Sequence, residues 1–203
     1  MRKKNFVIRR KRSAALRIKL FETAVELVEK VGYDNVSIDE ICKRVGVTKG
    51  AFYRHFKSKD QIVTERHMAY DAGFTNELLP QVSHMQPGIE KLMAYIRLTM
   101  KYMYSTTKKL VRLGYIVALS KKEPPYTPNK RELYKVLEQL VREGQACGEI
   151  RKDLPCAQIS STLLYSIIGL VFCWCMPGNR VDLEKACDHF LDIIQPGLRT
   201  TTD

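Results

Sequence analysis

The stretch SIDEICKRVGVTKGAFYRHF, residues 37–56, decides the fold of the N-terminal part of this chain. Ser37 and Glu40 have the S-x-x-E spacing of a capping box, which opens an α-helix. Apolar residues follow at helical spacing as far as Gly46, a residue typical of helix ends. Thr48 can then cap another helix. The pattern predicts two helices joined by a tight turn that contains glycine.

The second helix of this stretch, expected from Thr48 to about Lys57, combines apolar anchors with polar residues on its other faces. Phe52 and Phe56 are four residues apart and therefore share the face that packs on the preceding helices. Gly50 costs about 1 kcal/mol relative to alanine inside a helix. That cost is explained if a partner must approach the backbone closely, as the wall of a DNA groove does. The stretch therefore predicts a helix-turn-helix that faces the major groove.

The polar side chains around this glycine are of the kinds that contact duplex DNA. Lysine and arginine reach base edges or phosphates, and tyrosine and histidine donate to phosphates. Helix N-termini add free N–H groups and a positive dipole end. Each side chain alone could be an ordinary surface or packing residue, but together they indicate DNA binding. The candidate DNA-contacting side chains are those of Lys49, Tyr53, Arg54 and His55, together with the hydroxyls of Ser37 and Thr48.

A further helix is expected before the quoted stretch, from about Ser13 to Val31, with Gly32 as its C-terminal stop. One face of this helix is apolar at helical spacing. The residues of that face are Leu20, Phe21, Ala24, Leu27, Val28 and Val31. We therefore predict a three-helix DNA-binding domain over residues 13–58, preceded by a basic arm over residues 1–12.

The positive charge of the chain is concentrated in this region. The 203 residues have a formal net charge of +12. Residues 1–60 hold 16 Lys and Arg against 7 Asp and Glu, a net of +9, and residues 61–203 hold 18 against 15, a net of +3. A polyanionic partner of the N-terminal region explains this partition.

The remainder of the chain has helical periodicity and no strand-like alternation longer than a few residues. Glycine and proline bound the expected helices, and KKEPPYTP, residues 121–128, is the most loop-like stretch. The expected helices cover about residues 58–79, 87–104, 108–120, 129–146, 155–176 and 182–194, the first of them ending before Pro80. The predicted fold is all-α, with a small N-terminal helix-turn-helix domain and a larger helical domain for ligand binding and dimerisation over residues 59–203.

The last two expected helices predict the dimer interface. The helix over residues 155–176 is apolar on nearly every side, and such a helix needs partners on every side. A four-helix bundle of two helix pairs, one pair per subunit, supplies them. The densely apolar part of this helix, residues 163–176, is too short to span a bilayer, so we expect no membrane partner. The predicted interface residues are Leu163, Ile167, Leu170, Trp174, Leu183, Cys187, Phe190 and Ile194.

The larger domain is rich in tyrosine and methionine, which suit the lining of apolar pockets in helical bundles. Most of these residues are expected to be plain core. The candidates for a small-molecule pocket are Tyr70, Phe74, Tyr95, Met100, Met103, Tyr115 and Tyr165. A ligand beside Tyr70 or Phe74 could tilt the helix that joins the domains, and a coupling of about 1–3 kcal/mol is ordinary for such a switch.

The six cysteines are predicted to be free thiols in a reducing cytoplasm. None has the paired spacing of a zinc site, and the N-terminus lacks the apolar region of a secretory signal. No metal or other cofactor is predicted. A regulator that senses thiol oxidation or a metal through its cysteines is an alternative. A helical enzyme is a more distant one, because the four histidines are scattered and no nucleophile or phosphate-cradling motif occurs.

The segment FETAVELVEKVGYDNVSIDEICKRVGVTKGAFYRHFKSKDQI, residues 21–62, resembles the N-terminal domain of the TetR family of transcriptional regulators. The resemblance implies a repressor-like homodimer, cytoplasmic and associated with the nucleoid, that binds a palindromic double-stranded DNA operator. A small-molecule effector would release it. Positions that approach bases or the adjacent backbone are matched by Lys49, Gly50, Tyr53 and Arg54. Positions that contact phosphates are matched by Ser37, Thr48, His55 and Lys59.

Two features depart from the family pattern. Cys42 stands where the family usually has alanine, and we expect a buried, inert thiol there rather than an oxidisable one. The arm RKKNFVIRRKR is longer and more basic than the family minimum. It either reaches an adjacent minor groove or phosphates, or adds nonspecific affinity.

Overall fold

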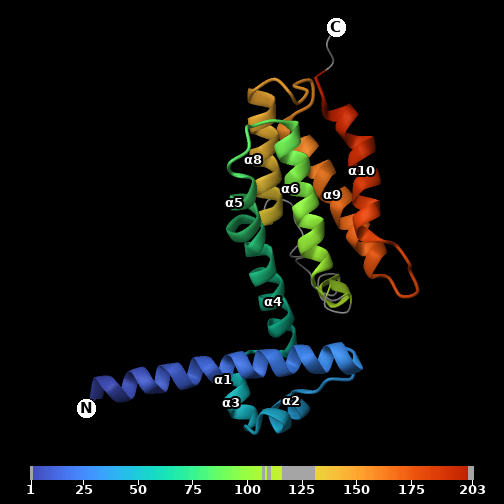
Figure 1. The fold of residues 1–203 in the computed structure, drawn as a ribbon. Coiled ribbons are helices and arrows are strands. Elements are labelled where there is room, and N and C mark those ends of the chain that lie inside the picture. Colours follow the sequence, from blue (N-terminus) through green and yellow to red (C-terminus); the bar gives the residue numbers. More distant parts are fainter. Residues whose placement is uncertain (1, 107, 109–110, 116–130, 201–203) are drawn as a thin grey trace. The chain divides into compact units, whose positions relative to one another are not determined.

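The computed structural model describes residues 2–106, 108, 111–115 and 131–200, and every regular element among them is a helix. One isolated β-bridge joins Ile150 and Arg199. The chain divides into two compact units, Met1–His67 and Met68–Asp203, here called the head unit and the body unit (Figure 1). The predicted all-α fold is confirmed.

The head unit is built from three helices and the first part of a fourth. They are α1 (Arg2–Val31), α2 (Ile38–Val45), α3 (Lys49–Tyr53) and α4 (Lys59–Gly73), the last of which ends in the body unit. Apolar side chains at helical spacing on the first two helices meet those of α3 and α4 in one small core. The buried residues are Leu20, Ala24, Leu27, Val28, Val36, Ile41, Cys42, Val45, Ala51, Phe52, Phe56 and Ile62.

Helix α1 begins at Arg2 rather than near Ser13. No glycine or proline occurs between Arg2 and Val31, and lysine and arginine have good helix propensity. Nothing in the local sequence therefore stops the helix at Ser13, and the basic residues before it continue α1.

The predicted caps of the helix-turn-helix are present. Ser37 Oγ accepts the N–H of Glu40 at 3.1 Å, and Thr48 Oγ1 accepts the N–H of Ala51 at 3.2 Å. Gly46 has φ +80°, the left-handed conformation that favours glycine, and its N–H donates to Cys42 O at 2.9 Å. These groups fix the ends of α2 and the start of α3.

Helix α3 ends at Tyr53, earlier than the predicted end near Lys57. The N–H of His55 donates to Phe52 O at 2.8 Å, which tightens the chain into a turn of the 3₁₀ type. The N–H of Phe56 still donates to the same carbonyl at 3.0 Å, and this hydrogen bond places the Phe56 side chain in the core.

The body unit is a bundle in which α8 and α9 lie side by side and α6 packs between α8 and α10 (Figure 1). Its elements after α4 are η1 (Phe74–Leu78), α5 (Leu79–Val82), α6 (Ile89–Tyr104), α8 (Glu132–Ala146), α9 (Cys156–Cys175) and α10 (Leu183–Leu198). The helix expected over residues 108–120 and the loop after it lie mostly outside the described residues.

Helical structure does not end before Pro80, contrary to prediction. A π-helical turn, η1, follows α4, and the N–H of Leu79 donates to Phe74 O. Pro80 then lies in the first turn of α5, where a missing N–H leaves no helical hydrogen bond unmade. Helix α10 extends beyond its predicted end at Ile194 to Leu198, with Pro196 inside it.

One helix among the described residues, α9, has the length and composition that could cross a membrane, with a mean hydropathy of 1.7. In the structure it packs on α8 and α10 through one face. The side chains of that face are Ile159, Leu163, Leu164, Ile167, Val171 and Trp174, all buried.

Candidate nucleic-acid interface

The orientation of α3 is set by two buried phenylalanines. Phe52 is 0% and Phe56 1% exposed, and their ring centroids lie 5.8 Å apart. Tyr53 meets the ring of Phe52 edge-on at 5.6 Å but remains 54% exposed. Because the apolar side of α3 is fixed in the core, its polar side must face away from the head unit.

Gly50 lies on this outer side with open space around it. A Cβ built there would have Thr48 Oγ1 at 3.8 Å as its nearest neighbour, an ordinary contact distance. Packing within the head unit therefore does not require a glycine at this position. The bare backbone is available to a partner that comes close.

Lys49 and Arg54, also exposed, bring positive charge beside Gly50. Lys49 Nζ lies 2.8 Å from Asp39 Oδ1, and this hydrogen bond raises the pKa of the lysine. Arg54 Nε donates to Gly50 O at 3.3 Å. Exposed ion pairs are weak, so an approaching phosphate can compete with Asp39 for Lys49.

The two hydroxyl caps retain hydrogen-bonding capacity. Ser37 and Thr48 are exposed, and each uses its oxygen as an acceptor within the head unit. A hydroxyl oxygen that accepts can still donate its proton. Both residues can therefore cap a helix and contact a phosphate at once.

His55 is half-buried, and its pKa is lowered, first by this burial and then by the nearby Arg17 and Arg54. The lowered pKa favours the neutral form of the ring. A neutral imidazole carries one N–H that can donate to a phosphate oxygen.

Lys59 has an internal role that the sequence did not indicate. Its Nζ donates to Tyr33 O at 2.6 Å and to Val36 O at 2.9 Å, and lies 3.9 Å from the centroid of the Tyr33 ring. Burial lowers the pKa of this lysine. Of its three N–H donors, two are thus used to tie the α1–α2 connection to α4, and only the third could reach a phosphate.

Arg17 supports the site although sequence reasoning missed it. Its guanidinium pairs with Glu65 at 2.6 Å and lies 4.5 Å from the centroid of the Phe56 ring. It thereby holds α1 to α4 across the phenylalanine that anchors α3. No local spacing could reveal this pairing, because its partners are 48 residues apart.

The predicted pocket residues do not all come together. Tyr70 stacks on Tyr102 with ring centroids 4.5 Å apart, and Phe74 meets both rings edge-on. Tyr95 is fully buried and donates its hydroxyl to Phe74 O at 3.1 Å. We call Tyr70, Phe74, Tyr95 and Tyr102 the aromatic cluster. Tyr165, in contrast, is 56% exposed.

The other three predicted pocket residues lie in the body unit. Met100 and Met103 are buried in the same core as the aromatic cluster. Tyr115 is half-buried and donates to Ile168 O at 3.0 Å, beside α9.

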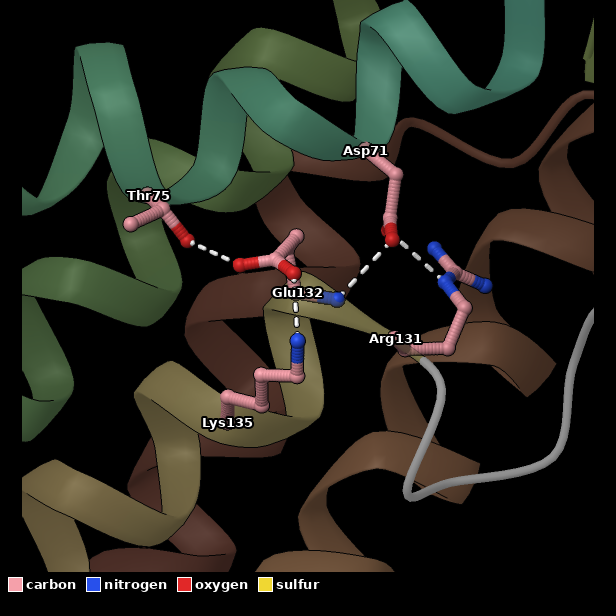
Figure 2. A network of polar contacts seen from close by, with 5 residues as sticks. All are labelled: Asp71, Thr75, Arg131, Glu132 and Lys135. Carbon is pink, nitrogen blue, oxygen red and sulfur yellow. Dashed lines mark hydrogen bonds and ion pairs between the residues drawn. The ribbon is translucent and has the colours of Figure 1, made fainter. Parts of the chain in front are cut away.

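Polar groups from the end of α4, from η1 and from the start of α8 form a network (Figure 2). Arg131 Nε donates to Asp71 Oδ1 at 2.7 Å, with side chains only 4% and 11% exposed, and the N–H of Glu132 donates to Asp71 Oδ2 at 2.9 Å. Lys135 and Thr75 bond to the carboxylate of Glu132 and lower its pKa. This network fixes the end of α4 against the start of α8.

The predicted dimer-interface residues mostly face the interior of the subunit. Leu170, Phe190 and Ile194 are half-buried. The five buried ones are Leu163, Ile167, Trp174, Leu183 and Cys187. The five buried side chains pack within one subunit, because periodicity identifies an apolar face but not what covers it, whereas the three half-buried ones stay predicted interface residues.

Three of the cysteines, Cys42, Cys175 and Cys187, have a raised pKa. Burial, followed by the charge of Asp39, raises the pKa of Cys42, and burial raises the pKa of Cys187 to about 11. Burial also raises the pKa of Cys175. Among the described residues, no three His, Cys, Asp or Glu side chains are grouped so as to hold a metal ion.

Comparison with known proteins gives matches to both units. The family described as bacterial regulatory proteins, tetR family, matches residues 20–65, and the YsiA-like protein, C-terminal region, matches residues 130–197. The fatty acid metabolism regulator protein of Bacillus subtilis is 22% identical over 187 residues, 89% of this chain and 94% of the relative.

Two further proteins extend this comparison. The transcriptional regulator AcuR of Cereibacter sphaeroides is 32% identical over 146 residues, 66% of this chain and 64% of the relative. The structure of a TetR-family transcriptional regulator from Pectobacterium atrosepticum superposes with a TM-score of 0.75 at 17% identity, covering 96% of this chain and 99% of that one.

Proposed function

Because the chain belongs to the TetR family of transcriptional regulators, we propose that it binds a palindromic DNA operator as a homodimer and that a small-molecule effector releases it. DNA binding is assigned to residues 13–58, and effector binding and dimerisation to residues 59–203. As family members are cytoplasmic DNA-binding proteins, we place it in the cytoplasm with the DNA.

The observation that carries this proposal is the outer side of α3. Gly50 is exposed and has no internal packing reason, Tyr53 is an aromatic residue left 54% exposed, and Lys49 and Arg54 flank both with positive charge. A major groove supplies what these residues lack, namely base edges and phosphates at close range.

Each side chain has a distinct role in the proposed complex. Lys49 and Arg54 reach base edges or phosphates beside Gly50, and the hydroxyl of Tyr53 donates to a phosphate. Ser37, Thr48 and His55 donate to phosphates at the rim, while Lys59 acts mainly by holding the α1–α2 connection. In a dimer the two copies of α3 would lie about 34–36 Å apart, or a further helical turn of DNA apart.

The dimer is proposed to form through the exposed face of α9 and α10. Tyr165 and Phe172 on α9 are 56% and 40% exposed, and Ile193 on α10 is 79% exposed. We take these exposed apolar side chains as the sign of an interface. A second copy of the same two helices would cover them and complete a four-helix bundle.

The effector is proposed to bind beside the aromatic cluster and to be largely apolar. The cluster offers stacked rings, with the buried Asp71–Arg131 pair next to them. The Bacillus subtilis relative is named for fatty acid metabolism, which makes long-chain acyl compounds the first class to test. In a repressor, effector and operator oppose one another. An acyl compound that binds the protein but tightens its hold on DNA would contradict this mechanism.

Selection of bound duplexes from a random pool, followed by two variants, tests the DNA-binding assignment. Arg54→Ala should relax base preference at one position by about 1–3 kcal/mol, and Tyr53→Phe should weaken all duplexes alike. Arg142→Ala, an exposed change on α8, is the matched control and should bind like the parent. The assignment fails if all three variants select and bind the same duplexes as the parent.

A further inference from the structure

The N-terminal part of α1 is a strongly basic helix. Residues 2–12 contain seven Lys and Arg and no Asp or Glu, and α1 includes all of them. Among the side chains that the structure describes, those of α1 are buried only from Leu20 onward, and none between Arg12 and Lys19 is buried. Figure 1 shows the N-terminal part of α1, in dark blue, extending past α3. Between Arg12 and Lys19 the helix therefore continues without support from a buried side chain.

Electrostatics disfavour such a helix unless an anion is near. The N-terminus is the positive end of the helix dipole, and the first turn of α1 contains no acidic residue to offset it. Arg9 and Arg12 are three residues apart, a spacing at which like charges on a helix repel. A polyanion would remove both penalties and stabilise the helix.

Dimensions decide where a continuous helix can bind on duplex DNA. An α-helix with its side chains is about 10–12 Å across, whereas the minor groove is about 6 Å wide. A helix therefore cannot enter the minor groove as an extended arm can. Phosphates are exposed along the edges of both grooves and accept hydrogen bonds without sequence requirement.

We propose that residues 2–12 extend α1 as a basic helix that binds the phosphate backbone of the DNA flanking the base pairs contacted by α3. This inference rests on the proposed operator binding and names a second DNA surface of the head unit. At 1.5 Å per residue the extension is about 16 Å long. Its two basic groups, residues 2–4 and 9–12, lie about 11 Å apart along the axis, so one helix can reach several phosphates.

The test compares two triple variants that remove the same charge. One is Arg9→Gln, Arg10→Gln and Arg12→Gln, in which glutamine keeps the helix propensity. The control is Lys101→Gln, Lys152→Gln and Arg180→Gln, three exposed cations of the body unit. The affinity of each variant is measured for a duplex that the parent selects, extended by long flanks of arbitrary sequence. The measurement is repeated at salt concentrations from about 50 to 200 mM.

The expected result is a shallower salt dependence for the first variant alone. Every phosphate that a variant no longer neutralises reduces the slope of log K against log salt by about 0.9. One such phosphate per subunit would change the slope of a dimer by about 1.8, so that affinity falls roughly tenfold less over this salt range. Base preference should not change, and trimming the flanks should abolish the difference from the parent.

A third variant, Val7→Pro, breaks the helix between the two basic groups while keeping every charge. The slope of log K against log salt should become shallower, and circular dichroism of the DNA complex should show less helix than in the parent. Equal binding by Val7→Pro and the parent would overturn the helical extension in favour of a flexible arm. Equal slopes for the two triple variants would overturn the binding to phosphates. A parent that selects no duplex would instead refute the proposed function itself.

Discussion

At the scale of single residues, Gly50 lowers the stability of a helix although no packing contact within the head unit requires a glycine there. The residue lies inside α3, and a Cβ there would meet nothing closer than 3.8 Å. Gly73 offers a contrast, because a Cβ at that position would lie 2.2 Å from the hydroxyl oxygen of Tyr102. The tertiary structure thus explains one helical glycine by packing and leaves the other to an external partner.

Gly50→Ala should therefore stabilise the protein and weaken DNA binding. Alanine improves helix propensity by up to about 1 kcal/mol, and the added methyl group has space. On DNA the methyl group would push α3 away from the groove wall, and we expect affinity to fall about tenfold, or 1.4 kcal/mol. Urea denaturation and a binding titration measure the two effects.

Gly197→Ala is the matched control, because this helical glycine of α10 also has open space around it. It should alter stability by a similar amount and leave DNA affinity unchanged. Unaltered DNA binding by Gly50→Ala would show that no partner approaches the backbone at α3.

His55 predicts a pH dependence of stability. Its pKa is lowered in the folded protein from the ordinary value of 6.5, so the folded state binds fewer protons than the unfolded state. The stability that the neutral His55 contributes is therefore fully present above pH 6.5, and it is lost as the pH falls from there through the lowered pKa. The free energy of unfolding is measured by denaturation at about pH 7.5 and about pH 5.5, on either side of the ordinary histidine pKa. It should change more between these two pH values in the parent than in His55→Gln. If the change is the same in both proteins, His55 is not its cause.

At the scale of elements, the body unit holds the end of α4 by a buried ion pair. Asp71 and Arg131 are nearly inaccessible to water, and Asp71 also accepts the first N–H of α8 from Glu132. A π-helical turn, a feature often found at functional sites, begins directly after α4, at Phe74. This junction lies beside the aromatic cluster, so an effector bound there would act on the helix that continues into the head unit.

Arg131→Met should destabilise the protein by about 3 kcal/mol, because it leaves the carboxylate of Asp71 buried without its counter-charge. The double variant Asp71→Asn with Arg131→Met removes both charges and keeps a carbonyl acceptor for the N–H of Glu132. It should recover most of the loss in urea denaturation. A double variant no more stable than Arg131→Met would show that the charge pairing is not what holds this junction.

At the scale of the whole molecule, the apolar surface of the body unit predicts its assembly. Ile193 is 79% exposed on α10, and Phe172 is 40% exposed on α9. Ile193→Glu should convert the proposed dimer to a monomer without unfolding it, since the residue contributes little to the core of one subunit. Light scattering coupled to gel filtration measures the mass.

Ala146→Glu adds the same charge at an exposed position of α8 and should leave the dimer intact. The monomeric variant should also bind DNA more weakly, because it loses the second operator half-site. Should Ile193→Glu remain a dimer, the interface must lie elsewhere on the body unit.

The sequence alone determined the local features that depend on near neighbours. The caps at Ser37 and Thr48, the left-handed Gly46 and the phenylalanine pair of α3 were all predictable, because each depends on residues three or four positions apart. The all-α fold followed from helical periodicity for the same reason. The continuation of the chain in helical form at Pro80 was not predictable, since a proline is tolerated in the first turn of a helix. The end of α10 at Leu198, beyond Pro196, was not predicted either.

Only the tertiary structure decided which apolar and charged groups face inward. Periodicity marked Leu163 and Trp174 as apolar but could not distinguish a subunit core from a dimer interface, and both are buried within the subunit. Likewise, Lys59 resembles a phosphate-binding residue in the sequence, yet its ammonium binds two carbonyls of the head unit. Burial and long-range pairing depend on residues far apart in the chain, so the physical reason for each appears only when the fold brings them together.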